Sequence, residues 1–244
     1  MTVGEFFTGL GYLVGLAVFV WASRRRGLSV AVMRPVIVGA LVGAIVGAKI
    51  AQLVAQGWPL QIPWWLIYDP RYGGRALLGG VVGGWIGVEI GKRRLGIKRS
   101  TGDLFALALP AGEAVGRIGC FFNGCCYGTE CHLPWAVWQH NAWRHPSQLY
   151  SALVAAVIFA FVLRLELKFH VVRGPGEASP IRGGDLFWIY LLLFGVSRFG
   201  LEFVRWRESL ILGLSPMQWF CLDLIAVGGV GLIRSKTRVQ RAPA

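Results

Sequence analysis

Long apolar segments, separated by short connectors, constrain the fold of this chain more than any other feature of its sequence. A bilayer core about 30 Å thick is crossed by roughly 20 predominantly apolar residues in a helix. The sequence therefore predicts an all-α fold: a polytopic membrane helix bundle with about seven transmembrane helices, built as a single integral membrane domain over residues 1–244. The predicted segments cover residues 6–22, 34–55, 76–91, 103–122, 147–164, 185–204 and 211–233.

The composition agrees with a membrane protein. Hydrophobic residues fill 55% of the positions and charged residues 15%, whereas a soluble domain carries roughly 25% charged residues. The net charge of +13 would suit a nucleic-acid-binding protein, but the basic residues cluster just outside the apolar segments, where they meet anionic lipid headgroups. We therefore expect the membrane as a partner and no nucleic acid. Because Glu5 is followed, not preceded, by the first arginines, the first segment is expected to remain as a helix and not to be a cleavable signal peptide.

The distribution of basic residues predicts the orientation. Connectors after the first, third, fifth and seventh segments carry 17 lysines and arginines, and those on the other side carry five. By the positive-inside rule the N-terminus lies outside and the C-terminus is cytoplasmic, with a basic cytoplasmic tail at 234–244. The outer face then holds a cysteine- and tryptophan-rich loop at 123–146 and the connector 56–75. Its tryptophan-rich stretch 58–68 is predicted to be an interfacial loop or half-helix, and 173–184 a flexible cytoplasmic connector.

Local sequence marks two helix starts. Ser100 and Asp103 have the spacing of a capping box, in which two side chains bond each other's backbone N–H groups. Ser215 precedes Pro216, as an N-cap residue precedes a proline at the first helical position. Helices are expected to begin at both places.

Charged residues within the predicted spans mark a candidate site. Glu113 and Arg117 are four residues apart and can pair on one helix face; Arg198 and Glu202 repeat this spacing, with Arg205 farther along. Charges at membrane depth are costly, so they face a protein interior or a wet cavity. One interpretation is that buried ion pairs fix helix packing. The other is an anion site for the phosphate of a phospholipid headgroup, because arginine is always charged and binds phosphate bidentately.

The string GRIGCFFNGCCYG, residues 116–128, is the most specific motif in the chain. It resembles the signature GRxGNFxNGExxG of prolipoprotein diacylglyceryl transferases, bacterial inner-membrane enzymes that lipidate lipoprotein precursors. Further segments are similar to segments of that family in the same order, so that the resemblance covers roughly residues 40–232. These segments are GAKIAQLV (47–54), LLGGVVGG (77–84), RHPSQLY (144–150), SRFGLEFVRW (197–206) and LGLSPMQW (212–219).

The resemblance implies a function and a location. In this family diacylglyceryl moves from phosphatidylglycerol to the thiol of a cysteine in a lipoprotein-precursor signal peptide, and glycerol-1-phosphate leaves. The expected partners are phosphatidylglycerol or another anionic phospholipid and the precursor signal peptide. We expect no cofactor, and the cysteine spacing discussed below leads us to expect no metal. The resemblance also implies a multi-pass protein of the bacterial inner membrane, with its active site facing the periplasmic side.

The same resemblance assigns candidate site residues. Arg117 and Arg198 match the family's functional arginines and suit stabilisation of the leaving phosphate, and Glu202 would hold Arg198 or Arg205 in place. The candidate catalytic residues are Arg117, Arg198, Glu202 and His145. The candidate residues for substrate binding are Asn123, Gly128, Gln148, Tyr150, Arg205 and Glu113.

Four positions depart from the family pattern. Leu78 stands where the family has a histidine before GG, a residue proposed as a general base, and Ser151 stands where HPSQLYE ends in an acidic residue. Cys120 replaces the asparagine of GRxGN, and Cys125 the glutamate of NGE. The phosphate-binding residues are therefore kept, whereas the groups that handle the proton are altered. Cys125, Glu113 and His145 are the candidates to replace the base.

Four cysteines, which lie close together in the predicted outer loop, have three interpretations. Disulfides that brace the loop are favoured in an outer compartment, although the adjacent Cys125 and Cys126 would not bond each other. A redox-active or nucleophilic cysteine is a second interpretation, because Arg117 would lower a nearby thiol pKa. A metal site with His132 or His140 is less favoured, because the spacing lacks the paired CxxC of structural zinc. The cysteines concerned are Cys120, Cys125, Cys126 and Cys131; Cys221 is expected to be an apolar core residue.

Three functions remain open at this point. The first is a lipid-to-thiol transferase of this family, or a diverged relative with another acceptor, which the arginines and the order of motifs favour. The second is a membrane thiol oxidoreductase, favoured by the cysteines and the lost histidine. The third is a non-catalytic phospholipid-binding protein, which would keep the arginines and need no base.

Overall fold

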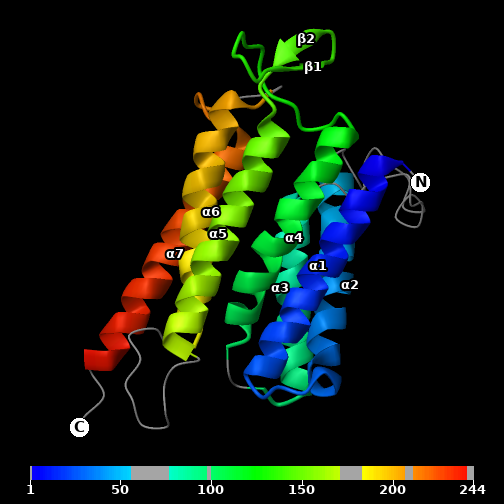
Figure 1. Ribbon diagram of the computed structural model, residues 1–244. Coiled ribbons are helices and arrows are strands. Elements are labelled where there is room, and N and C mark those ends of the chain that lie inside the picture. The colour runs from blue at the N-terminus through cyan, green and yellow to red at the C-terminus, as the bar shows by residue number, and fades with distance from the viewer. Residues whose placement is uncertain (1, 56–76, 98–99, 171–182, 207–210, 241–244) are drawn as a thin grey trace. The chain divides into compact units, whose positions relative to one another are not determined.

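Seven α-helices make up most of the part of the chain that the computed structural model describes, residues 2–55, 77–97, 100–170, 183–206 and 211–240. Each falls on one of the predicted segments, so the prediction of a mostly helical chain is confirmed (Figure 1). The helices are α1 (Val3–Arg25), α2 (Val30–Ala55), α3 (Leu77–Arg94), α4 (Gly102–Phe122), α5 (Ser147–His170), α6 (Asp185–Leu201) with the 3-10 turn η2 (Glu202–Val204), and α7 (Pro216–Gln240).

Five helical stretches among the described residues are long and apolar enough to cross a membrane: α1, α2, α4, α6 with η2, and α7. Their apolar side chains face outward in large numbers, as expected where lipid is the solvent. In α4, 39% of the apolar stretch is buried, against 17% in α1 and 11% in α2, so α4 is the most enclosed of the three. The chain is therefore a multi-pass membrane protein by length and composition.

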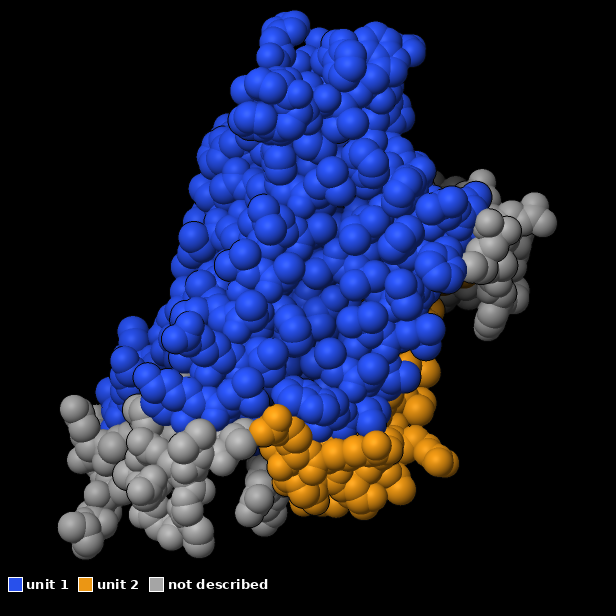
Figure 2. Space-filling model, viewed as in Figure 1, with its two compact units in different colours: residues 1–22, 100–244 blue, residues 23–99 orange. Residues whose placement is uncertain are grey.

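The chain divides into two compact units, residues 1–22 with 100–244 and residues 23–99 (Figure 2). In the smaller unit α2 and α3 pack through glycines spaced four residues apart. A Cβ at Gly43 would overlap the carbonyl oxygen of Gly83, and the next pairs of glycines along the two helices are equally close. Small residues at this spacing let helix backbones approach closely, as is common within membranes.

In the larger unit α4 packs against α5 and α6, and α6 packs against α7. Close glycines also join α1 to α4, because a Cβ on Gly11 would lie 2.8 Å from the carbonyl oxygen of Gly112. Two aromatic pairs lie along the same contact: Phe19 with Phe105, and Phe7 stacked on Phe122 at 5.5 Å.

Helices begin at both predicted starts, α4 at Gly102 and α7 at Pro216, but only one of the two predicted caps is present. Ser215 forms the expected cap: its Oγ accepts a hydrogen bond from the Gln218 N–H at 3.1 Å, and the Gln218 Oε1 accepts one from the Ser215 N–H at 2.9 Å. The capping box of Ser100 and Asp103 is wrong, because the N-cap residue is Thr101 and its side chain makes no capping bond. Asp103 instead accepts hydrogen bonds from the N–H groups of Gly184 at 2.7 Å and Phe187 at 3.3 Å, so it caps the neighbouring α6.

A two-stranded antiparallel hairpin, β1 (Val137–Gln139) and β2 (Ala142–Arg144), lies in the loop between α4 and α5. The prediction of an all-α chain missed it. His140 and Asn141 form its turn with φ of 51° and 59°, the left-handed pair typical of tight hairpins. The predicted interfacial stretch 58–68 lies outside the described residues, as do residues 173–182 of the cytoplasmic connector and 241–244 of the tail.

Candidate functional site

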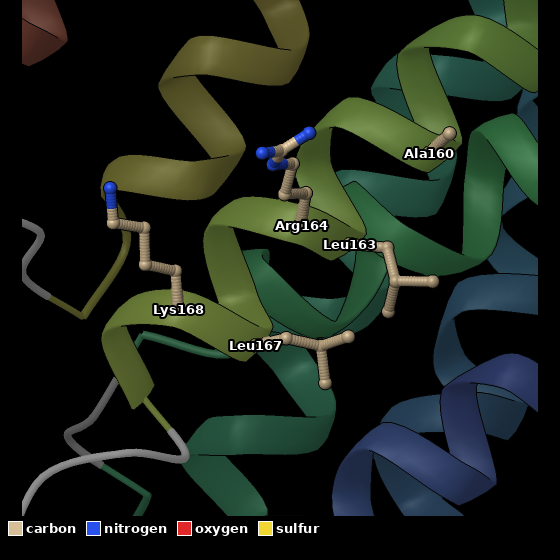
Figure 3. A pocket seen from close by; sticks show the side chains of 5 residues that line it. All are labelled: Ala160, Leu163, Arg164, Leu167 and Lys168. Atoms are coloured by element: carbon tan, nitrogen blue, oxygen red, sulfur yellow. The ribbon is translucent and has the colours of Figure 1, made fainter.

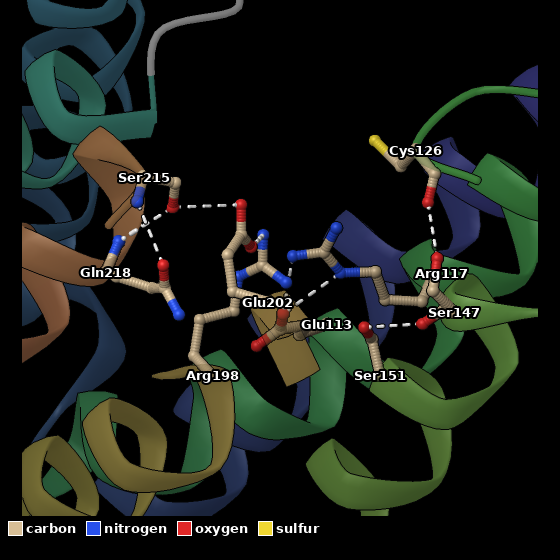
Figure 4. A network of polar contacts seen from close by, with 9 residues as sticks. All are labelled: Glu113, Arg117, Cys126, Ser147, Ser151, Arg198, Glu202, Ser215 and Gln218. Carbon is tan, nitrogen blue, oxygen red and sulfur yellow. Dashed lines mark hydrogen bonds and ion pairs between the residues drawn. The ribbon is translucent and has the colours of Figure 1, made fainter. Parts of the chain in front are cut away.

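Two arginine–glutamate pairs lie together in the larger unit. Arg117 Nη2 and Nε lie 2.9 and 3.0 Å from Glu113 Oε1 on α4, and Arg198 Nη2 lies 2.8 Å from Glu202 Oε2 where α6 passes into η2. Figure 4 shows the two arginines extending toward one another from their separate helices. The predicted pairing of both i,i+4 partners is present in the structure.

The charges of this group do not cancel. Arg198 is only 5% exposed, and its Nε has no hydrogen-bond partner. Within the described part of the chain the Arg205 side chain has neither a hydrogen bond nor an ion pair. Arg198 interacts electrostatically with Arg205, Arg117, Glu113 and Glu202, and these three arginines and two glutamates carry a formal charge of +1. A buried, incompletely bonded guanidinium in such a group suits an anionic ligand.

Glu202 also connects α6 to the start of α7. Its Oε1 accepts a hydrogen bond from the Ser215 Oγ at 3.3 Å, and Ser215 is at the same time the N-cap of α7 (Figure 4). Glu202 and Ser215 are 6% and 3% exposed. The helix cap thus holds the carboxylate that holds Arg198.

The cysteine motif begins as a helix end of the Schellman type. Gly124 has φ of 64°; its N–H donates to Phe121 O at 3.1 Å, and the N–H of Cys125 donates to Cys120 O at 3.1 Å. Cys126 follows with φ of 63°, a conformation that costs a non-glycine residue free energy. The chain consequently folds back over the last turn of α4, which brings Cys125 and Cys126 next to Cys120.

Side chains from the neighbouring elements hold this turn by its carbonyl groups. Ser147 Oγ donates to Cys126 O at 2.7 Å, and Gln148 Nε2 donates to Cys125 O at 2.9 Å, both from the start of α5. His140 Nε2 lies 2.7 Å from Gly124 O. Hydrogen bonds therefore hold three successive carbonyl oxygens of the turn. Gln148 is only 1% exposed, so it packs in the protein interior and also supports the cysteine turn.

Three thiols gather in this turn. The sulfur atoms of Cys120, Cys125 and Cys126 all lie within 4.8 Å of one another, whereas Cys131 is not part of that group. All five cysteines are free in the structure, so a bridge within the loop stays a prediction. A hydrogen bond with Cys120 lowers the pKa of the Cys126 thiol to about 5, although burial alone would raise it. The positive charges of Arg205 and Arg117 lower this pKa as well. Burial raises the pKa of Cys125. Cys221 is fully buried, as expected of an apolar core residue.

The segment from Tyr127 to Glu130 runs between the hairpin and the end of η2. Gly128 N donates to His145 O at 3.1 Å, Thr129 N to Val204 O at 3.0 Å, and Trp206 N to Tyr127 O at 3.1 Å. A Cβ on Gly128 would lie 2.5 Å from His145 O and 2.7 Å from Val204 O, so only glycine fits. Gly128 thus joins three of the sequence motifs through the backbone.

The remaining predicted residues lie at the edge of this group. His145 Nδ1 is 3.4 Å from the Tyr150 hydroxyl, which accepts a hydrogen bond from Trp135 Nε1 at 2.6 Å. Asn123 is the exposed C-cap of α4, and its Oδ1 is 3.5 Å from the Thr2 hydroxyl at the start of α1. Among the described residues, neither His145 nor Asn123 forms a hydrogen bond or ion pair with the arginine–glutamate pairs.

Arg144 was not among the predicted site residues, although it is buried and bonded within the outer loop. Arg144 is 7% exposed; it forms an ion pair with Glu130 at 3.2 Å and donates to Gln139 O at 3.1 Å. Its guanidinium also lies 5.1 Å from the Tyr127 ring and 5.3 Å from the Trp206 ring, which are cation–π distances. Its place in the RHPSQLY segment was the one available signal, but nothing in the sequence indicated that a loop arginine would be buried.

Two hollows accompany these helices. A small cavity of about 10 Å³ lies beside the arginine pairs, with Glu113, Ser151 and Arg198 among its walls, and it has room for about one water molecule. An open hollow of about 500 Å³ lies along the last turns of α5 (Figure 3). It is lined by Ala160, Leu163, Arg164, Leu167 and Lys168, a mixture of aliphatic and basic side chains typical of a helix end at a membrane surface, and it contains none of the predicted site residues.

Comparison with known proteins identifies the family. A sequence profile described as prolipoprotein diacylglyceryl transferase matches residues 6–234. A protein of Idiomarina loihiensis is 34% identical over 188 residues, which cover 72% of this chain and 65% of that protein, just under two thirds of its length. One of Gloeobacter violaceus is 32% identical over 74% of this chain and 69% of its own length, and one of Synechocystis is 28% identical over 93% and 83%.

All three relatives are described as phosphatidylglycerol–prolipoprotein diacylglyceryl transferases. The comparisons confirm the resemblance that the motifs indicated, and with it the prediction of a membrane transferase. This chain belongs to the prolipoprotein diacylglyceryl transferase family.

Proposed function

We propose that this protein transfers the diacylglyceryl group of phosphatidylglycerol to the cysteine thiol of a lipoprotein precursor. The observation that carries the proposal is the buried Arg198, whose Nε has no hydrogen-bond partner, in a group of three arginines and two glutamates with a formal charge of +1. A phosphodiester with one negative charge complements such a group. As the bond from carbon to the phosphate oxygen breaks, a second negative charge develops on the leaving glycerol phosphate, where fixed guanidinium groups stabilise it.

The residues have separate parts in this proposal. Arg117, Arg198 and Arg205 bind the phosphate, whereas Glu113 and Glu202 are positioning residues that orient Arg117 and Arg198 through their ion pairs. The outer end of the site, where the acceptor peptide would arrive, is shaped by the remaining candidate residues: Gly128, Gln148, Tyr150, His145 and Asn123. The acceptor is the signal-peptide cysteine of the precursor, and other anionic phospholipids are potential donors.

The proposal includes a setting in the membrane. The chain forms one integral domain of the bacterial inner membrane with about seven spans, in which α3 and α5 accompany the five apolar stretches. Its N-terminus lies outside, its C-terminus is cytoplasmic, and the arginine group faces the periplasmic side, because the excess of basic residues lies on the opposite connectors.

Transfer by purified protein tests the function. The protein is incubated with labelled phosphatidylglycerol and a lipobox peptide, and the release of glycerol-1-phosphate is followed together with the mass of the peptide. We expect Arg198→Ala and Arg117→Ala to reduce the rate about a hundredfold or more, since each removes a group that stabilises the transition-state charge. Arg164→Ala on the exposed side of α5 is the matched control and should retain the rate.

The outcomes separate the three functions. Lipid binding without transfer, lost in Arg198→Ala, would replace the proposal by a phospholipid-binding protein. Oxidation or reduction of peptide thiols without lipid transfer would replace it by a thiol oxidoreductase. Transfer to a different thiol acceptor, with the lipobox peptide inert, would limit the proposal to the donor half of the reaction.

A further inference from the structure

The group of three thiols has no part in the phosphate chemistry described above. Cys120 lies in the last turn of α4, and the left-handed residues Gly124 and Cys126 turn the chain back so that Cys125 and Cys126 join it. Their sulfur atoms lie within 4.8 Å of one another. A tetrahedral zinc site with Zn–S bonds of about 2.3 Å places its sulfurs about 3.8 Å apart, so a contraction of about 1 Å closes this group around such an ion.

Hydrogen bonds fix the backbone of the turn that carries these thiols, and a metal-binding loop needs a fixed backbone of this kind. Ser147, Gln148 and His140 bond three successive carbonyl oxygens of the turn, and the hydrogen bond between Cys125 N and Cys120 O ties it to the helix. Arg117 interacts electrostatically with Cys120 and Cys126, and Arg205 with Cys126, so positive groups offset the negative charge of several thiolates. A preorganised loop of this kind reduces the entropy that binding must overcome.

The ligand count indicates the type of site. The described residues supply three thiols to the group and no fourth His, Cys, Asp or Glu. Structural zinc sites are closed by four protein ligands, whereas catalytic ones have three and keep one position open. Cys125 is exposed, so the group can be reached from outside the helices. The sequence-based expectation of no metal relied on the absence of paired CxxC motifs, and it did not include the contribution of the helix-end turn.

We propose that Cys120, Cys125 and Cys126 bind a zinc-class divalent cation through three thiolates, and that its open position takes the thiol of the acceptor cysteine. The second half rests on the proposed transferase function. A thiol that coordinates such an ion loses its proton, so the cation does the work of the base that Leu78 does not supply. Arg117 lies near both groups, which connects the ion to the phosphate site.

The reaction balances without an oxidant or reductant. The acceptor S–H releases its proton to solvent as the sulfur binds the cation. The sulfur then forms a bond to the glyceryl carbon, and the bond from that carbon to the phosphate oxygen breaks with its electron pair on oxygen. Glycerol-1-phosphate leaves, and the thioether that remains is a weak ligand that dissociates from the cation.

Cobalt(II) binding to the whole protein tests the site independently of activity. Purified protein, reduced and freed of metal, should take up one equivalent of Co(II) with thiolate charge-transfer and tetrahedral ligand-field absorption, and Zn(II) should displace it. We expect Cys120→Ser and Cys126→Ser each to weaken binding about a hundredfold, because one of three ligands is lost. Cys131→Ser is the matched control and should bind as the unaltered protein does. Equal binding by the variant with all three cysteines replaced by serine would overturn the site.

Two further measurements test the open position. A lipobox peptide should shift the cobalt spectrum, and the same peptide with serine in place of cysteine should not; no shift with either peptide overturns the role of the open position. Treatment with a chelator should abolish lipid transfer, and Zn(II) should restore it. Full transfer by metal-free protein would overturn the zinc role and leave the proposed function intact. Cobalt binding with a peptide shift, but no transfer under any condition, would overturn the proposed function and leave the metal site.

Discussion

Gly128 illustrates how one residue connects distant parts of this chain. It lies between His145 at the start of α5 and Val204 in η2, and both backbones are too close for a side chain at this position. The sequence motif predicted Gly128 as a substrate-binding residue, but a ligand contact is not the reason why a glycine is needed here. The reason is the requirement that two other motifs pass on either side of it.

Replacing Gly128 by alanine should therefore be destabilising. The added methyl group would meet His145 O and Val204 O, and overpacking of this kind costs about 2 kcal/mol. Thermal unfolding in detergent measures the loss. Gly9→Ala on α1 is the control, because among the described residues no atom outside its own stretch of helix lies within 4 Å of the added Cβ, and a helical alanine is favoured over glycine by up to about 1 kcal/mol. Equal stability of the two variants would contradict the packing argument.

Ser215 is a second position where one side chain does two things. Its hydroxyl accepts a hydrogen bond from Gln218 N and donates one to Glu202 Oε1. Ser215→Ala should lower the free energy of unfolding by about 2 kcal/mol, because loss of a cap costs about 1 kcal/mol and the buried carboxylate loses a donor. It should also slow lipid transfer, since Glu202 holds Arg198. Ser215→Thr keeps the hydroxyl and should recover both properties; a threonine variant as impaired as the alanine variant would disprove this role.

At the scale of helices, α2 and α3 are joined by backbone contact more than by side chains. Facing glycines recur every four residues on both helices, so the two backbones approach one another along most of their contact. A bilayer offers no hydrophobic driving force for such pairing, and the free energy comes from van der Waals contact at short range. The contact is consequently sensitive to single methyl groups.

Adjacent glycines of α3 offer a matched test of this contact. A Cβ on Gly83 would lie 2.8 Å from the Cα of Gly47, whereas a Cβ on Gly84 would lie 3.5 Å from its nearest neighbours. Gly83→Ala should lower the melting temperature in detergent, and Gly84→Ala should leave it unchanged or raise it, because alanine favours a helix by about 1 kcal/mol. The reverse order of stability would show that the helices do not pack in this way.

The elements differ in how far the sequence predicts them. Apolar length predicts every described helix, and the i,i+4 spacing predicts both arginine–glutamate pairs, because these depend only on local geometry. The capping role of Asp103 could not be predicted, since its partners lie 81 and 84 residues away. The close approach of the three thiols could not be predicted, because it requires two left-handed residues at the end of a helix. The burial of Arg144 could not be predicted either, because its partners come from separate segments of the chain.

For the whole molecule, the orientation in the membrane is the prediction with the widest consequences. If the N-terminus is outside, Cys125 is exposed to the periplasm and Thr237, near the end of α7, to the cytoplasm. In a variant without other cysteines, Cys125 should react with a membrane-impermeant maleimide in spheroplasts. A single cysteine introduced as Thr237→Cys should react only after the membrane is permeabilised. The opposite pattern would reverse the topology and place the arginine group on the cytoplasmic side.

The hydrogen bonds of Asp103 have a mechanical consequence for the site. They fasten the beginning of α4 to the beginning of α6, and the two arginines lie toward the other ends of these helices. At a rise of about 1.5 Å per residue, about 20 Å of α4 separates Asp103 from Arg117. The separation of the two guanidinium groups therefore depends on a contact about 20 Å away: a rotation of about 5° at Asp103 would move them by roughly 2 Å over that length.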